Sequence, residues 1–150
     1  MDTKQTWFIT GSSRGFGRAL VRAGLDAGDN VVATARRPEQ LKEFTDAHGD
    51  RVLALAVDVT DREAVDNAVH SAAARFGALD VVVNNAGYAN LAPIKTGDEE
   101  DFRAQFETNF WGVYNVSKAV ISQLRGQRGG VIVQFSSIGG RVGGSAGLAS

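Results

Sequence analysis

The sequence contains no cysteine, which excludes a disulfide framework, a thiolate metal site and a cysteine nucleophile. Its 2 histidines, His48 and His70, lack the spacing of metal ligands, so we expect no metal site. Basic and acidic residues nearly balance, at 16 and 17, and without a basic block no nucleic-acid partner is expected. No apolar run is long enough to span a bilayer, and the first residues lack the apolar core of a signal peptide. We therefore expect a cytoplasmic protein with no membrane partner and one domain, residues 1–150.

Glycine, in contrast, is abundant, with 18 residues that gather in turns. Residues 6–17 join a short apolar strand to a turn that contains Gly11, Gly15 and Gly17, after which apolar residues recur at helical spacing. Strand, glycine turn and helix are the layout of a dinucleotide-binding loop, in which backbone N–H groups and the helix dipole face a diphosphate. A strand-to-helix turn that merely tolerates glycine is the alternative.

Short apolar strands alternate with helices along the whole chain. The predicted strands span residues 6–10, 31–35, 52–57, 79–83 and 131–135. The predicted helices follow them, and the last is a long helix over 98–124. Strands that are apolar on both faces predict an α/β fold: a Rossmann-type, doubly wound parallel sheet in three layers, α/β/α. A ligand is expected at the carboxyl ends of the first and fourth strands, where the winding reverses.

The fifth strand raises a question about the edge of this sheet. Its residues, 131–135, are apolar enough for a strand buried on both faces, yet in a five-stranded sheet it would lie at an open edge. Only a glycine-rich stretch follows, to Ser150. We therefore expect the fold to be truncated after the fifth strand, as the N-terminal part of a longer single-domain fold. A swapped or dimeric partner that covers the edge is the alternative.

The end of the second strand carries charge that favours NADP(H) over NAD(H). Enzymes that prefer NAD place an acid there to bind the ribose hydroxyls, whereas here Ala35 is followed by Arg36 and Arg37. Arg14 projects from the glycine turn close by. Because arginine binds phosphate through paired, charge-assisted hydrogen bonds, these residues are candidates for binding a 2′-phosphate. Solvated charges at a helix start are the alternative for Arg36 and Arg37.

Polar and small residues also follow the third, fourth and fifth strands at the same rim. Asp58 can accept a hydrogen bond from an adenine amino group, or simply cap a helix. The run at 84–87 lets a cofactor approach the backbone and lets amides tie strand ends together, or it forms a plain turn. A serine hydroxyl after the fifth strand can donate to a substrate oxygen. The residues concerned are Asp58, Val59, Asn84, Asn85, Ala86, Gly87, Ser136 and Ser137.

Asn109 is the polar residue of interest in the long helix. By the 3.6-residue period it shares a face with Phe102, Phe106 and Val113, and a polar side chain on such a stripe needs partners. A structural hydrogen bond explains its presence about as well as catalysis does. Gly112, three residues later, weakens the helix and permits a kink.

Taken in order, these motifs resemble the short-chain dehydrogenase/reductase family, over the whole of the sequence. The motifs are residues 10–17, Asp58–Val59, residues 84–87, Asn109 and Ser136–Ser137. The resemblance implies an NADP(H)-dependent oxidoreductase that interconverts an alcohol and a carbonyl by hydride transfer. The cofactor contacts it implies are Gly11, Ser13, Arg14, Gly15, Phe16, Gly17, Arg36, Arg37, Asp58, Val59, Asn85, Ala86 and Gly87.

The resemblance also implies catalytic roles, with Ser137 stabilising the substrate oxygen and Asn109 holding a water in a proton relay. The family's tyrosine, followed four residues later by lysine, is due just past Ser150, so residues 1–150 alone are expected to be inactive. A small-molecule substrate and a homo-oligomer, dimer or tetramer, are further implications. Two alternatives remain open: a non-catalytic NADP(H)-binding module or sensor, and a subunit whose long helix serves chiefly for assembly.

Overall fold

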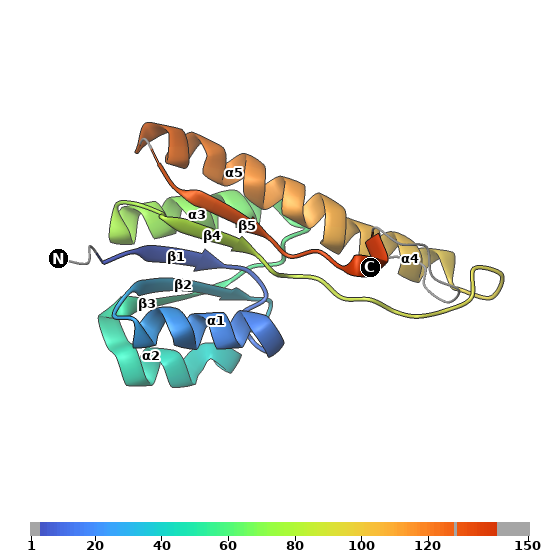
Figure 1. Ribbon diagram of the computed structural model, residues 1–150, viewed down its shortest axis with the longest axis horizontal. Coiled ribbons are helices and arrows are strands. Elements are labelled where there is room, and N and C mark those ends of the chain that lie inside the picture. Colours follow the sequence, from blue (N-terminus) through green and yellow to red (C-terminus); the bar gives the residue numbers. More distant parts are fainter. Residues whose placement is uncertain (1–3, 128, 141–150) are drawn as a thin grey trace.

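The computed structural model describes residues 4–127 and 129–140. Five parallel strands form one sheet in the order β3-β2-β1-β4-β5 (Figure 1). The strands are β1 (Thr6–Ile9), β2 (Asn30–Ala35), β3 (Val52–Ala56), β4 (Val81–Asn84) and β5 (Val131–Gln134). The chain winds outward from β1 to β3 and then crosses back to β4, so the winding reverses between β1 and β4. The predicted doubly wound, Rossmann-type α/β fold is confirmed.

Helices cover both faces of this sheet, which gives three layers. Figure 1 shows α1 and α2 on one side and α3 and α5 on the other. The helices are α1 (Gly15–Asp26), α2 (Lys42–His48), α3 (Arg62–Phe76), α4 (Glu99–Phe106) and α5 (Val113–Gly126). Shorter helical turns are η1 (Pro38–Leu41), η2 (Gly49–Arg51), η3 (Glu107–Gly112) and η4 (Ile138–Gly140).

The two faces of the sheet carry alternate residues of the same strands. Phe8 and Val32 pack into a core with α3 and α5, whereas Ile9 and Val31 pack into a second core with α1 and α2. All four side chains are fully buried. Because both faces are covered, the strands are continuously apolar instead of alternating with polar residues, which is the pattern that predicted them.

The start of α3 is capped by an aspartate side chain. The Asp61 carboxylate accepts a hydrogen bond from the Ala64 N–H at 3.1 Å, so Asp61 is the N-cap. The Asp98 carboxylate caps α4 in the same way, accepting from the Glu100 N–H at 2.8 Å. Each cap satisfies N–H groups that have no partner within the helix.

The single long helix predicted over 98–124 is wrong in detail. It is divided into α4, the six-residue π-helical turn η3 and α5. The turn ends at Gly112. A Cβ atom there would lie 2.5 Å from Val59 Cγ2, so the close approach of the helix to Val59 requires a residue without a side chain.

The residues that face the core also differ from the predicted stripe. The predicted apolar stripe is exposed at Phe106, whose side chain is 47% accessible, whereas Gln105 and Val116 are fully buried. Phe106 and Gln105 belong to α4, which Figure 1 shows extending past the end of the sheet. The π turn adds a residue and shifts the helical phase only of the residues after it, such as Val116.

β5 lies at the edge of the sheet, as the strand order predicts. The burial on both faces that its composition predicts is not seen among the described residues, since Val131 is 57% exposed. Residues 141–150 lie outside the described part of the chain. Within that part, none of the helices combines the length and the apolar character needed to cross a bilayer.

Candidate functional site

Two adjoining cavities lie at the carboxyl ends of the strands, around the point where the winding reverses. The first has a volume of about 270 Å³ and the second about 350 Å³. The first is lined by Gly11, Ser13, Arg14, Gly15, Phe16, Ala35, Arg36, Val57, Asp58, Val59, Asn85, Ala86, Gly87 and Thr108. The second is lined by Asn84, Asn85, Ala86, Gly87, Tyr88, Ala89, Asn109, Val113, Phe135, Ser136 and Ser137.

The structure therefore brings the residues predicted to bind a cofactor to one cavity, except Gly17 and Arg37. Asn85, Ala86 and Gly87 form a wall that the two cavities share. Ser137 and Asn109, which the sequence predicts as catalytic, lie together at the second cavity. The arrangement offers an elongated ligand one compartment for its nucleotide part and a neighbouring compartment for a reacting group.

The glycine turn packs closely against the end of β4. Gly11 has a φ of +66°, and a Cβ atom there would lie 2.8 Å from Ala86 Cα. A Cβ atom at Gly17 would overlap the Gly11 carbonyl oxygen and lie 2.5 Å from Asn85 Nδ2. Gly17 is buried behind the turn and does not line the cavity, so its small size serves the packing of the turn itself.

Thr10 and Asn85 tie the ends of β1 and β4 together. The buried Thr10 hydroxyl accepts from the backbone N–H groups of Asn85 at 3.1 Å and Ala86 at 3.0 Å, and it donates to the Val83 carbonyl at 3.3 Å. The Asn85 amide donates to the carbonyl oxygens of Thr10 and Gly11, both at 3.1 Å. These side chains fix the backbone of the shared wall, which is the tying role the sequence suggests for the amides at 84–87.

The first cavity has basic residues on two of its walls. Arg14 belongs to the glycine turn and Arg36 follows the last residue of β2, and both are exposed. Neither forms an ion pair with any residue in the part of the chain that the structure describes. Arg37, the N-cap of η1, is exposed and lies outside the cavity lining. The cavity thus offers two guanidinium groups to an anion, where the sequence suggests three.

Asp58 takes part in the turn that leads into α3. Its Oδ1 accepts hydrogen bonds from the backbone N–H of Thr60 at 2.9 Å and the Thr60 hydroxyl at 2.8 Å. Asp58 and Val59 both line the first cavity, so the carboxylate organises the turn and faces the cavity as well. Because Asp61 is the N-cap of α3, the interpretation of Asp58 as a helix cap is wrong, and its contact with an adenine stays a prediction.

Asn109 holds the segment that follows β4. Its Oδ1 accepts from the Tyr88 N–H at 3.0 Å, and its Nδ2 donates to the Tyr88 carbonyl at 2.7 Å. A Cβ atom at Gly87 would lie 3.0 Å from Asn109 Oδ1, so the segment passes very close to the helix. The structural hydrogen bond considered for Asn109 is therefore present. Thr108, beside it in η3, lines the first cavity and was missed because helical periodicity gives no sign of a π turn.

Ser137 lies just past β5, beside η4. It is half-buried, and its Oγ accepts a hydrogen bond from the Gly139 N–H at 3.1 Å. Because a hydroxyl oxygen that accepts still has its hydrogen to donate, Ser137 retains a donor for the second cavity. Ser136 is more exposed at the same cavity. Over residues 4–127 and 129–140, no three His, Cys, Asp or Glu side chains gather as a metal site would require.

Comparison with known proteins identifies the family. The sequence model of the short chain dehydrogenase family matches residues 5–149. The chain therefore belongs to the short-chain dehydrogenase family, as its ordered motifs suggested.

Individual relatives agree with this assignment. Oxidoreductase BOA17 of Botryotinia fuckeliana is 54% identical over 138 residues, which are 91% of this chain and 50% of that protein. The NADP-dependent 3-hydroxy acid dehydrogenase YdfG of Shigella flexneri is 33% identical over 133 residues, 88% of this chain and 54% of that protein. The chain spans about half the length of the curated relatives it matches.

Solved structures give the same result for the fold. A short-chain dehydrogenase from Streptomyces avermitilis superposes with a TM-score of 0.89 and is 38% identical in sequence. The match covers 93% of this chain and 52% of the other. The sheet order and the helix layers described above are thus those of a known member of the family.

Proposed function

We propose that the protein is an NADP(H)-dependent oxidoreductase that interconverts an alcohol and a carbonyl group of a small molecule, with residues 1–150 as its NADP-binding part. The observation that carries this proposal is the pair of adjoining cavities. One is lined by a glycine turn and two arginines, and the other by Ser137, whose hydroxyl accepts a hydrogen bond from Gly139 and can still donate. Family membership supports an oxidoreductase, and the printed name of the Shigella flexneri relative includes NADP dependence.

The lining of the first cavity suits a nicotinamide dinucleotide by its chemistry. Gly11 and Gly15 line this cavity without side chains, so a diphosphate can approach the backbone of the turn. α1 begins at Gly15, and its N-cap Arg14 forms no side-chain capping bond, so the first N–H groups of the helix can bind the diphosphate. Asp58 and Val59 would contact the adenine, and Ala86 and Gly87 the adjacent ribose.

Preference for NADP(H) over NAD(H) follows from the two basic walls. The 2′-phosphate distinguishes the two cofactors and carries about −1.5 to −2 charges near neutral pH. Arg14 and Arg36 flank the cavity on opposite segments, so a phosphate between them would receive charge-assisted hydrogen bonds from both sides. In place of an acid, Ala35 ends β2, which leaves no carboxylate there to repel that phosphate.

Bound NADPH supplies a hydride to a carbonyl carbon. Ser137 would donate its hydroxyl hydrogen to the substrate oxygen and stabilise the negative charge that develops there. Asn109 would hold the backbone of Tyr88 as a wall of the second cavity, since both polar ends of its side chain bind that backbone. Proton transfer is proposed for a tyrosine and lysine beyond residue 150.

We also propose that the protein forms a homo-oligomer, a dimer or tetramer, through the surface formed by α4, η3 and the start of α5. A row of aromatic side chains supports this: neighbouring rings of Phe106, Phe110, Trp111 and Tyr114 lie 5.2–6.0 Å apart. Each of the four is 45–55% exposed. Exposed apolar patches of this kind are common at protein–protein contacts. The mass of the assembly in solution tests the proposal.

The experiment that tests the proposed function uses the protein in its full length with NADPH and a panel of ketones and aldehydes. We expect NADPH oxidation, and a loss of turnover of about 10²-fold in Ser137→Ala, the usual effect of removing one oxyanion donor. The matched control is Ser71→Ala, the same change at an exposed position of α3. Unaltered turnover in Ser137→Ala would remove Ser137 from the mechanism. Tight NADPH binding without reduction of any carbonyl would favour the alternative, a non-catalytic sensor.

A further inference from the structure

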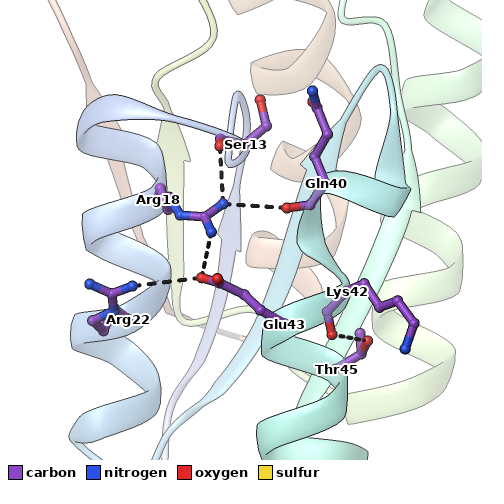
Figure 2. A network of polar contacts seen from close by, with 7 residues as sticks. All are labelled: Ser13, Arg18, Arg22, Gln40, Lys42, Glu43 and Thr45. Carbon is purple, nitrogen blue, oxygen red and sulfur yellow. Dashed lines mark hydrogen bonds and ion pairs between the residues drawn. The ribbon is translucent and has the colours of Figure 1, made fainter.

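Arg18 of α1 connects the glycine turn just before it to the segment of Gln40 and Glu43, more than 20 residues further along the chain. Its Nη1 donates to the Ser13 carbonyl oxygen at 3.2 Å and to the Gln40 carbonyl oxygen at 3.3 Å. Its Nη2 forms an ion pair with Glu43 Oε1 at 2.6 Å. Figure 2 shows the guanidinium at the centre of this network, between the glycine turn on one side and the segment of Gln40 and Glu43 on the other.

Packing holds this guanidinium in place. The Arg18 Cζ atom lies 5.2 Å from the centroid of the Phe44 ring, and Phe44 is buried. The Arg18 side chain itself is only 31% exposed. A planar cation that stacks on an aromatic ring and donates from both of its ends has little freedom to move. Arg18 therefore acts as a stiff connection, in contrast to a mobile surface charge.

The segments that Arg18 connects carry the two basic walls of the first cavity. Ser13 is followed by Arg14, and η1, which ends at Leu41 beside Gln40, begins two residues after Arg36. Just before these two segments begin, the chain is already joined by a hydrogen bond from the Ser12 N–H to the Thr34 carbonyl oxygen at 2.9 Å. Beyond the strand ends, Arg18 supplies the hydrogen bonds and the ion pair that join residues 13–17 to 36–43, as far as the described residues show.

We propose that Arg18 is a positioning residue for a nucleotide 2′-phosphate: it sets the spacing between Arg14 and Arg36 without lining the cavity itself. This inference rests on the proposed use of NADP(H). Two arginines hold one phosphate in paired hydrogen bonds only when their backbones are the right distance apart. The diphosphate needs only the glycine turn, so loss of Arg18 should weaken the binding of NADPH more than that of NADH.

The test is a comparison of Arg18→Met with Arg22→Met in the full-length protein. Arg22 is one turn further along α1 and its Nη2 lies 3.6 Å from the same Glu43 Oε1, so its substitution removes the same charge and leaves the contacts to Ser13 and Gln40. The measurement is the dissociation constant of NADPH and of NADH for each variant, together with its melting temperature. For Arg18→Met we expect the constant for NADPH to rise about tenfold and that for NADH by less than about threefold, the effect of misplacing one charged hydrogen bond.

Several results would overturn the inference. If Arg18→Met raises the dissociation constants of NADPH and NADH by the same factor, the glycine turn is damaged in general. If Arg22→Met changes the two constants in the same way as Arg18→Met, the effect is one of charge alone. If Arg18→Met does not fold, Arg18→Lys replaces it, because a single ammonium group cannot form the same fork of contacts. A lowered preference for NADPH in Arg18→Lys supports the inference, and a wild-type preference overturns it. If the wild-type protein binds NADPH and NADH equally well, the proposed preference for NADP(H) fails as well. If the wild-type protein and Arg18→Met both prefer NADPH to the same extent, only the role proposed for Arg18 is contradicted.

Discussion

Thr10→Val offers the most direct test of how the shared wall of the two cavities is held. Valine has nearly the shape of threonine and replaces the hydroxyl with a methyl group. The change would remove the acceptor of two backbone N–H groups, those of Asn85 and Ala86, and a donor to the Val83 carbonyl. Since the side chain is 1% exposed, no water can replace the hydroxyl without a rearrangement of the turn.

The expected cost follows from the two orphaned donors. A buried donor left without an acceptor costs about 1–3 kcal/mol, so two would cost about 2–6 kcal/mol if both were closed to water. Both N–H groups are only partly buried, and the new methyl group gains some apolar burial. We therefore expect the free energy of unfolding to fall by about 2 kcal/mol, near the lower end of this range.

The assay is urea unfolding of wild type, Thr10→Val and Thr10→Ser under one set of conditions. Thr10→Ser keeps the hydroxyl and loses a methyl group, which costs about 1 kcal/mol. The valine variant should therefore be the less stable of the two, although it is the more apolar. A valine variant within about 0.5 kcal/mol of wild type, or more stable than the serine variant, would refute the role assigned to the hydroxyl.

Two further predictions concern the first cavity. Arg36→Asp should raise the dissociation constant of NADPH at least tenfold, since charge-assisted hydrogen bonds contribute about 1.5–3 kcal/mol, and it should lower the preference for NADPH over NADH. An unchanged ratio of the two constants, measured by titration, would contradict the assignment of Arg36. Gly17→Ala should destabilise the fold by more than the roughly 1–3 kcal/mol of ordinary overpacking, because its Cβ would meet backbone. Gly126→Ala is its control: none of the described residues lies within 4 Å of the added atom, so a change below about 1 kcal/mol is expected in thermal unfolding.

The fold could be predicted because its signals are local and repeated. The strands are apolar on both faces, the helices between them have a clear period, and caps such as Asp61 mark where a helix begins. The strand order then follows from general rules about winding. The π turn η3 could not be predicted, because one extra residue in a helix leaves no mark on composition beyond Gly112. That single shift is enough to misplace the apolar face of the following residues.

The site residues could be predicted in part for a related reason. The carboxyl ends of parallel strands meet at one edge, so residues that follow a strand, such as Arg36 and Asp58, converge wherever the strands themselves are right. Partners that depend on tertiary geometry could not be found this way. Asn109 binds the backbone of Tyr88, 21 residues away in a loop without periodicity. The sequence gives no sign that Arg18 differs from other helix residues, because its contacts with Gln40 and Glu43 depend on the folded structure.

The polar residues of the motifs divide into two kinds, and the division has consequences for experiment. The side chains of Thr10, Asn85 and Asn109 bind backbone groups, so they shape the cavities through the main chain. Arg14 and Arg36 instead face a cavity without an ion-pair partner in the described part of the chain. Substitutions of the first kind should lower the free energy of unfolding along with ligand affinity. Those of the second kind should change affinity while leaving stability within about 0.5 kcal/mol, as exposed positions usually do. A motif residue is therefore not by itself a ligand contact, and measuring both quantities on each variant separates the two roles.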